Sequence, residues 1–269
     1  MIIANSIPKS GTHLLVSLLE RLGKTDSHSH LSGSLVRDHV WWKSAYKTII
    51  KSLPGDKVRV DLDTDNRYPI HLIDYNLRKK SNEYFCEAHL PYSETMNRII
   101  LSHSAKMIYI VRDPRDIILS YINHMERDDD YPLHGLFKQA SNISEKIKLV
   151  LDGESYNGSK WLSPIKQRID RSVGWADCDS AILVKFEELI GSKGGGDDTK
   201  QISAVQRIMD FIGAEGVAEE VASKIFDKNS ETFNKGQAGR WIREIPGSDI
   251  DYIDLIIGDS IRRLGYEAV

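Results

Sequence analysis

The feature that most constrains the fold is a short apolar run that passes almost directly into a helical pattern at the start of the chain. Met1–Asn5 is apolar enough for a buried strand, and Thr12–Leu22 carries leucines at helical spacing before Gly23 ends the pattern. Further buried strands are expected at Tyr84–Ala88, Met107–Val111 and Ala181–Phe186. Apolar strands separated by helices predict an α/β fold in three layers, with a central parallel sheet flanked by helices.

The segments between these strands complete a prediction of one domain over residues 1–269. Helical spacing predicts helices at Asp38–Leu53, at Pro91–Ser104 and from Pro114 onward. Ser27–Gly33 is predicted to be a loop, and Gly191–Asp198, with three consecutive glycines, a flexible one. Helices are expected to dominate from there to the end of the chain, and no internal repeat is seen.

Composition narrows the possible functions. The formal net charge of −3 argues against a general nucleic-acid binder, although a local basic pocket for a small anion is still allowed. No apolar run reaches the length needed to span a membrane, and no secretory signal pattern is present at the N-terminus. Two cysteines, Cys86 and Cys178, fit a reducing compartment better than a disulfide scaffold. We therefore expect a cytoplasmic protein that binds neither membranes nor nucleic acid.

The stretch "IPKSGTH", residues 7–13, lies between the first predicted strand and helix. The first N–H groups of a helix have no partner within the helix, and Gly11 lets the backbone approach an oxyanion closely. Lys9 adds positive charge, and Ser10 and Thr12 add hydroxyl donors. These residues predict a phosphate cradle; the alternative is a capped turn with a surface lysine. The lysine precedes the only glycine, so this is not the usual nucleoside-triphosphate loop.

A second anion-binding candidate is "VRDPRDIILSY", which begins in the strand that ends at Val111. Arg112 follows that strand, and Ser120 lies about two turns along the next helix. Ligands of open α/β sheets bind beyond the carboxyl ends of the strands, where an arginine can hold a phosphate through two N–H groups. The alternative is a structural salt bridge from Arg112 to Asp113 or Asp116.

The third candidate is "FNKGQAGRW", residues 233–241. Lys235 supplies charge, while Gly236 and Gly239 permit a close approach of the backbone. Taken alone, this segment is equally an ordinary solvated loop.

Together, these three segments resemble the PAPS-dependent sulfotransferase family, in the order in which that family carries them. PAPS, 3′-phosphoadenosine-5′-phosphosulfate, is the sulfuryl donor, and the resemblance implies a P-loop-like α/β/α fold, transfer to a hydroxyl or amine, and no metal. The segment "ILVKFEEL" near residue 185 also resembles a strand that this family carries. The resemblance implies that nucleotide-binding residues are Lys9, Ser10, Gly11, Thr12 and His13 at the 5′ end, and Arg112, Ser120, Phe233, Asn234, Lys235 and Gly236 around the 3′-phosphate.

The resemblance also implies two catalytic residues. Lys9 matches the family lysine that stabilises the leaving group, and "FCEAHLP" resembles the segment whose histidine, here His89, is the general base. A histidine can accept a proton near neutral pH. Glu87 is the rival base, because some glycan sulfotransferases use a glutamate.

Several positions depart from the family pattern. Glu87 stands where the family has a lysine, and Leu14 stands where an aromatic residue often follows the phosphosulfate loop. Asn234 replaces the family arginine, whose place Arg240 is then expected to take. Adenine must stack on another ring, for which the candidates are Trp41, Trp42 and Phe233. The dimer segment of the family is not recognised, so no oligomeric state is predicted.

The acceptor is expected to lie against the segment that follows the Ser120 helix. Helical insertions at about residues 126–175 are predicted to form a lid over it. The acidic residues there favour a small cationic metabolite or natural-product intermediate as acceptor, whereas a glycan or glycolipid is the main competitor. These residues are Glu126, Asp128, Asp129 and Asp130, and the alternative is that they form a solvated acidic turn.

Two other functions fit parts of the pattern. A small-molecule kinase of the P-loop class would also cradle phosphates, but it needs magnesium, which sulfuryl transfer from PAPS does not. A non-catalytic nucleotide-binding module would bind the nucleotide without turnover, and the presence of Lys9 and His89 argues against it.

Overall fold

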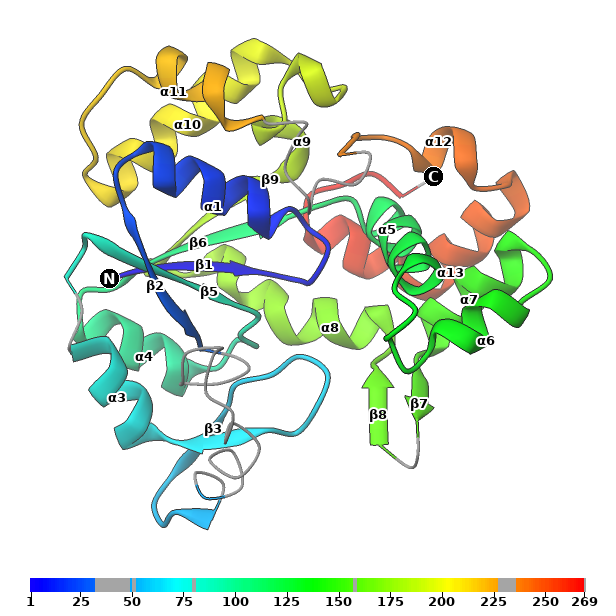
Figure 1. Cartoon of the computed structure of the whole chain (residues 1–269), viewed down its shortest axis with the longest axis horizontal. Coiled ribbons are helices and arrows are strands. Elements are labelled where there is room, and N and C mark those ends of the chain that lie inside the picture. The colour runs from blue at the N-terminus through cyan, green and yellow to red at the C-terminus, as the bar shows by residue number, and fades with distance from the viewer. Residues whose placement is uncertain (32–48, 50–51, 79–80, 157–158, 227–235, 269) are drawn as a thin grey trace.

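The structure is a computed structural model that describes residues 1–31, 49, 52–78, 81–156, 159–226 and 236–268. Its centre is a five-stranded, wholly parallel sheet in the order β2-β5-β1-β6-β9 (Figure 1). The predicted three-layer α/β fold with a central parallel sheet is therefore confirmed. The strands are β1 (Ile2–Ser6), β2 (Thr25–His30), β5 (Tyr84–Ala88), β6 (Lys106–Val111) and β9 (Ala181–Lys185).

Helices cover both faces of this sheet, and each layer buries its own apolar cluster. One face packs against α1 (Thr12–Arg21), α10 (Asp198–Ile212) and α11 (Ala218–Ile225). The other face packs against helices that include α4 (Glu94–Ser102) and α8 (Ile165–Ser172). The remaining helices are α3 (Ile70–Arg78), α5 (Pro114–Arg127), α6 (His134–Gln139), α7 (Ile143–Asp152), α9 (Phe186–Leu189), α12 (Trp241–Glu244) and α13 (Gly247–Arg263).

Residues 126–175 contain the predicted helices together with one element that was not predicted. This region holds helices α6, α7 and α8, and a hairpin of β7 (Glu154–Tyr156) and β8 (Ser159–Leu162) connects α7 to α8. A second hairpin, β3 (Lys57–Arg59) with β4 (Arg67–Pro69), precedes α3. The role of residues 126–175 as an acceptor lid stays a prediction.

One local prediction was wrong. Residues 27–30 belong to strand β2 rather than a loop, because pairing with β5 at the sheet edge outweighs their polar side chains. The predicted loop at residues 191–198 contains a short 3₁₀ helix, η2 (Ser192–Gly194), in which Gly194 is buried and accepts a hydrogen bond from the Ala238 N–H, and the last residue of the loop begins α10. The flexibility of this loop stays a prediction.

Other element boundaries shift for identifiable reasons. The helix expected from Pro91 begins at Glu94, because the side chain of Ser93 accepts a hydrogen bond from the Met96 N–H. Phe186, expected in a strand, is the first residue of α9. The helix expected at Asp38–Leu53 falls almost wholly outside the described residues.

The order of the strands determines where a ligand can bind. The chain moves from β1 to β2 and β5 on one side, and then to β6 and β9 on the other. A crevice forms at such a switch point beyond the carboxyl ends of the strands. The segments that follow β1, β5, β6 and β9 begin at this edge: loops carry Lys9, His89 and Arg112, and Phe186 is the first residue of α9.

No helix within the described ranges combines the length and apolar character needed to cross a membrane. Cys86 and Cys178 are both free thiols.

Candidate active site

A cavity of about 600 Å³ lies at this edge of the sheet. Side chains and backbone from several segments far apart in the sequence line it. Its lining residues are Pro8, Lys9, Gly11, Thr12, His13, Leu14, Glu87, His89, Arg112, Ser120, His124, Arg127, Asp128, Phe186 and Gly236. The structure thus brings together most of the residues predicted from the three motifs.

The loop between β1 and α1 has the backbone shape that an anion site needs. Gly11 is the N-cap of α1 and has a φ of 102°, in the left-handed region that favours glycine. Neither a capping side chain nor an acidic residue occupies the first turn of α1. The N–H groups of this turn, together with the positive end of the helix dipole, are therefore available to an oxyanion.

Lys9 lies in this loop with a φ of 74°, an uncommon value for a residue other than glycine. Burial lowers the pKa of Lys9 to about 8, and the nearby Asp128 carboxylate acts in the opposite direction. Arg168 adds to the lowering. Lys9 is thus an ammonium at neutral pH that loses its charge at a mildly alkaline pH.

The Phe186 ring lies against both the loop and Arg112. A Cβ atom added at Gly11 would come within 2.5 Å of Phe186 Cδ2. The Arg112 guanidinium carbon lies 4.4 Å from the centre of the same ring, a cation–π distance. Only glycine therefore fits at position 11, for reasons of both backbone shape and space.

Hydroxyl groups connect the loop to His89. Ser6 Oγ lies 2.7 Å from Thr12 Oγ1 and 3.2 Å from His89 Nδ1. Ser10 Oγ is fully buried and has no hydrogen-bond partner. An unpartnered buried hydroxyl beside an anion cradle fits a bound oxyanion.

His89 directly follows β5, and its tautomer is determined by the Ser6 carbonyl. His89 Nδ1 is 2.8 Å from that oxygen, which can only accept, so Nδ1 carries the hydrogen and Nε2 carries the lone pair. Burial, and then His30, whose ring centre is 5.2 Å away, lower the pKa of His89 to about 3. The imidazole is therefore neutral throughout the physiological pH range.

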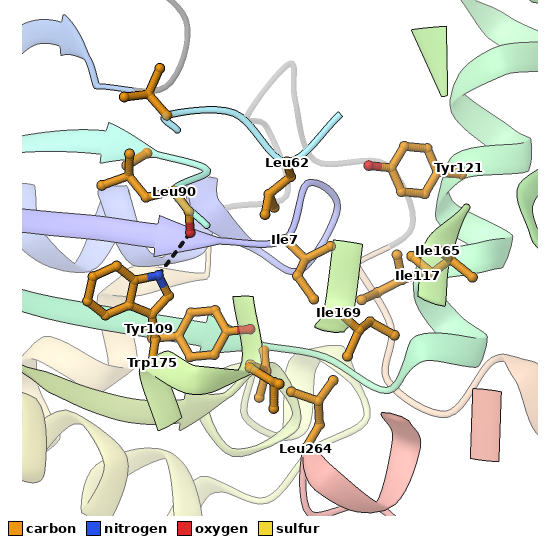
Figure 2. Packing of buried hydrophobic residues seen from close by; sticks show 14 of the residues in the cluster. Ile7, Leu62, Leu90, Tyr109, Ile117, Tyr121, Ile165, Ile169, Trp175 and Leu264 are labelled. Carbon is orange, nitrogen blue, oxygen red and sulfur yellow. Dashed lines mark hydrogen bonds between the residues drawn. The ribbon is translucent and has the colours of Figure 1, made fainter. Parts of the chain in front are cut away.

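The backbone beside His89 is held from two directions. The Leu90 N–H donates to the Asn5 side chain at 2.7 Å, and the Leu90 carbonyl accepts from the Trp175 indole at 2.9 Å. Figure 2 shows this indole contact within the packed core. Trp175 is fully buried, so the position of the base candidate is set by the core and not by a surface loop.

Arg112 and Ser120 both reach the cavity from the β6–α5 region, as predicted. The Arg112 side chain donates from Nη2 to the Gln237 carbonyl at 2.8 Å and lies 3.6 Å from the Asp116 carboxylate. Its Nε is buried without a hydrogen-bond partner. The predicted salt bridge to Asp116 and an anion-binding role are therefore compatible, because one donor is still uncommitted.

The residues predicted near the C-terminus are only partly described. Gly236 lines the cavity, whereas Phe233, Asn234, Lys235, Trp41 and Trp42 lie outside the described residues. Arg240 is buried, but it pairs with the Glu244 carboxylate through Nε and Nη2. The structure therefore does not place Arg240 in the cavity as a substitute for the family arginine.

The four acidic residues at and after the end of α5 point to different surroundings in the structure. Asp128 lines the cavity. Glu126 pairs with Lys146 at 2.6 Å, and Asp129 pairs with His134 at 3.3 Å. Asp130 is exposed and does not line the cavity. Of the predicted acceptor-binding set, only Asp128 is placed where it faces the other site residues.

Several lining or supporting residues escaped the sequence analysis, among them Arg127, which lines the cavity from the last position of α5. His124 lies one turn after Ser120 on α5, so helical spacing from Ser120 was a signal that pointed to it. Ser6 immediately precedes the loop motif, but nothing local shows that it contacts His89. Phe186 lies 175 positions after Gly11 in the chain and carries no sequence signal for this contact.

The donor set of the cavity suits an anion more than a cation. Over the ranges that the structure describes, no group of three or more His, Cys, Asp or Glu side chains is arranged to hold a metal ion. A second cavity of about 230 Å³ lies between η2, α10 and α11 and has no lining residue in common with the first. It contains none of the predicted site residues.

Comparison with known proteins supports the same interpretation. The family model described as "Sulfotransferase domain" matches residues 1–265. The curated mouse (Mus musculus) protein Sulfotransferase 2B1 is 22% identical over 249 residues, which are 91% of this chain and 59% of the mouse protein. The chain thus spans less than two thirds of the length of that relative.

Solved structures show the same fold at low identity. Mouse sulfotransferase SULT7A1 complexed with PAP matches with a TM-score of 0.60 and 17% identity, over 97% of this chain and 84% of that one. Retinol dehydratase in complex with androsterone and the inactive cofactor PAP matches with a TM-score of 0.56 and 17% identity, over 97% and 80% of the two chains.

Proposed function

The chain belongs to the sulfotransferase domain family, and we propose that it transfers the sulfuryl group of PAPS to a hydroxyl or amine of a small molecule. One observation carries the proposal. Lys9, His89, Arg112 and Gly236, which come from four separate segments, line one cavity at the sheet edge. The proposal agrees with the similar solved structures, which are complexes with PAP, the product that PAPS leaves behind.

The residues present fit a nucleotide with phosphates at both ends. The uncapped first turn of α1 and the buried Ser10 hydroxyl would hold the 5′ side. Arg112 Nε, Ser120 and the backbone at Gly236 would hold the 3′-phosphate. The bound donor supplies a sulfuryl group attached to a phosphate leaving group.

In this mechanism, Lys9 neutralises charge on the departing phosphate oxygen as the bond from that oxygen to sulfur breaks. His89 Nε2 accepts the proton of the acceptor hydroxyl or amine as the new bond to sulfur forms. The Nδ1–H bond to the Ser6 carbonyl raises the pKa of His89 and so stabilises the imidazolium that results, against the burial that lowers this pKa. Burial of Lys9 strengthens its interaction with the developing charge.

Glu87 is the second candidate for the base, because it lines the same cavity and lies two residues before His89 on β5. We propose His89 as the base, since its tautomer is already fixed in the proton-accepting form. His89→Asn keeps a side chain able to bond to Ser6 but removes the base, whereas Glu87→Gln removes only the charge. The larger loss of kcat, about 10²-fold or more, is expected for His89→Asn.

For the acceptor, we propose a small polar molecule that binds beside His124 and Asp128. His124 lies in the last turn of α5 and Asp128 is the C-cap of that helix, with His124 Nε2 4.0 Å from Asp128 Oδ2. The Asp128 carboxylate favours an acceptor with a cationic group. A glycan acceptor is the competing possibility, and a screen that includes amino alcohols and simple saccharides separates the two.

The first test is calorimetry without magnesium, comparing PAP with AMP, which lacks only the 3′-phosphate, and with ATP. Tighter binding of PAP than of AMP, lost in Arg112→Ala, is the expected result. Preference for ATP, or equal binding of PAP and AMP, would overturn the proposal and favour a phosphotransferase. Release of PAP on adding PAPS and an acceptor separates an enzyme from a non-catalytic binding module.

A further inference from the structure

The carboxylate of Asp116 joins α5 to a segment 123 residues further along the chain. Asp116 Oδ2 accepts a hydrogen bond from the Gly239 N–H at 2.7 Å, and Oδ1 accepts one from the Trp241 N–H at 3.0 Å. The side chain is 1% exposed, and it does not line the cavity. Both of its oxygens are therefore used to hold backbone rather than a ligand.

Two arginines near Asp116, Arg112 just before the N-cap of α5 and Arg115 in its first turn, hold the same segment. Arg112 donates to the Gln237 carbonyl at 2.8 Å. The Arg115 guanidinium carbon lies 3.7 Å from the centre of the Trp241 ring, and Arg115 itself is fixed by two hydrogen bonds to Asp113. Residues at the start of α5 therefore contact residues 237–241 through hydrogen bonds and a cation–π interaction.

The opposite side of this segment is held by the turn at Gly194. The Ala238 N–H donates to the Gly194 carbonyl at 2.9 Å, and a Cβ at Gly194 would come within 2.8 Å of the Gly236 carbonyl. Gly239 has a φ of 69°, which allows its N–H to point to Asp116. Residues 236–241 are therefore clamped between α5 and η2, directly beside the cavity.

We propose that Asp116 is a positioning residue for recognition of the 3′-phosphate: it fixes residues 236–241 and aligns Arg112 without touching the nucleotide. The inference rests on the proposed function. Asp116 lies 3.6 Å from the guanidinium whose Nη2 binds Gln237 and whose Nε is uncommitted. One carboxylate thereby determines both the direction of Arg112 and the position of Gly236, which both line the cavity.

The test measures binding of PAP and AMP to Asp116→Asn by calorimetry on the full chain. An asparagine offers one acceptor and turns an NH₂ group toward a backbone N–H, so one of the two bonds is lost. We expect the dissociation constant for PAP to rise about tenfold or more, while that for AMP changes less than about twofold. Arg112→Ala should remove most of this difference, because the two residues act on the same phosphate.

A second variant covers the possibility that Asp116→Asn folds poorly. Trp241→Leu removes the ring under Arg115 but leaves the buried carboxylate intact, and it should weaken PAP binding selectively, by about threefold. Val205→Ala, in the buried face of α10, is the control for general loss of stability. It should lower the melting temperature without changing the ratio of PAP to AMP affinity.

The outcomes separate the inference from the proposed function. If the wild-type chain does not prefer PAP to AMP, the proposed function fails. If the wild-type chain does prefer PAP, but Asp116→Asn weakens both nucleotides equally or leaves the ratio unchanged, the positioning role of Asp116 is overturned.

Discussion

The β1–α1 loop takes its anion-binding groups from consecutive residues, whereas the Arg112 end of the cavity takes them from segments more than 120 residues apart. Gly11, Lys9 and the first turn of α1 are shaped by local backbone geometry. Arg112 is instead aligned by Asp116 and by the carbonyl of Gln237. The β1–α1 loop depends on backbone conformation and the Arg112 end on tertiary packing. Substitutions in the two regions should therefore change catalysis, PAP binding and AMP binding in different proportions.

The largest effect on kcat is expected from Lys9→Met, which removes the positive charge of the β1–α1 loop. Loss of a preorganised cation at the leaving group should lower kcat by about 10²- to 10³-fold. PAP binding should weaken much less, because the backbone N–H groups of α1 are still present. Steady-state kinetics and calorimetry on the same preparation check this, and a loss of binding equal to the loss of kcat would contradict it.

Gly11→Ala should distort the backbone of the β1–α1 loop without changing its charge. The φ of 102° and the 2.5 Å approach to the Phe186 ring together should cost about 1–3 kcal/mol of stability and weaken PAP and AMP alike. Gly213→Ala is the matched control, since Gly213 also has a positive φ but its added Cβ would meet nothing within 4 Å. Denaturant unfolding measures the loss of stability in both variants, and calorimetry measures their nucleotide binding. Gly213→Ala reports backbone strain alone, whereas Gly11→Ala reports strain together with the collision with Phe186.

Asp128→Asn should change the pH dependence of kcat/KM, because Asp128 affects the pKa of Lys9 in the β1–α1 loop. The protonated form of Lys9 is the active one, so kcat/KM should fall as pH rises through about 8. The Asp128 carboxylate raises the pKa of Lys9, and its removal should move this fall to lower pH, with about twofold less activity at pH 8. Asp130→Asn, two residues away and exposed, should leave the profile unchanged. A shift to higher pH in Asp128→Asn would contradict the assignment.

The smallest effect is expected from a change behind the Arg112 end of the cavity, where Tyr266 supports the start of α5 through Glu187. The Tyr266 hydroxyl donates to Glu187 at 2.7 Å, and the other oxygen of Glu187 accepts from the Asp113 N–H at 3.0 Å. Tyr266→Phe should therefore loosen the start of α5 and weaken PAP binding about two- to threefold, with AMP unaffected. Tyr252→Phe, on the exposed side of α13, is the control. Equal losses for PAP and AMP would show that the two regions are not separable.

The same contrast explains what could be predicted from the sequence. The strands, helix α1 and the Lys9 loop follow from apolar runs, helical spacing and a single glycine, all of which are local. Arg112 was located by its place after a buried strand. The contacts from Asp116 to Gly239 and from Phe186 to Gly11 join residues far apart in the chain, and no local pattern encodes them.

Polar strands and partly acidic segments were harder to predict for a similar reason. Residues 27–30 are polar, and they are strand only because β5 offers hydrogen bonds at the sheet edge. Glu126 and Asp129 looked equivalent to Asp128 in the sequence, but Glu126 forms an ion pair with Lys146 and Asp129 lies 3.3 Å from His134 Nε2, away from the cavity. Side-chain direction depends on partners that the sequence does not identify.

The Phe186 ring has a consequence for how this chain can diverge in evolution or be redesigned. One face of a single side chain limits position 11, and the same ring carries the Arg112 guanidinium. A smaller residue at 186 would remove the ring that contacts Arg112, and it would relax only the steric part of the demand for glycine at position 11, because the φ of 102° still favours glycine there. Related chains that change the residue at 186 should therefore keep glycine at 11 but change the residue at 112, and an engineer who wishes to alter nucleotide preference must redesign positions 112 and 186 together.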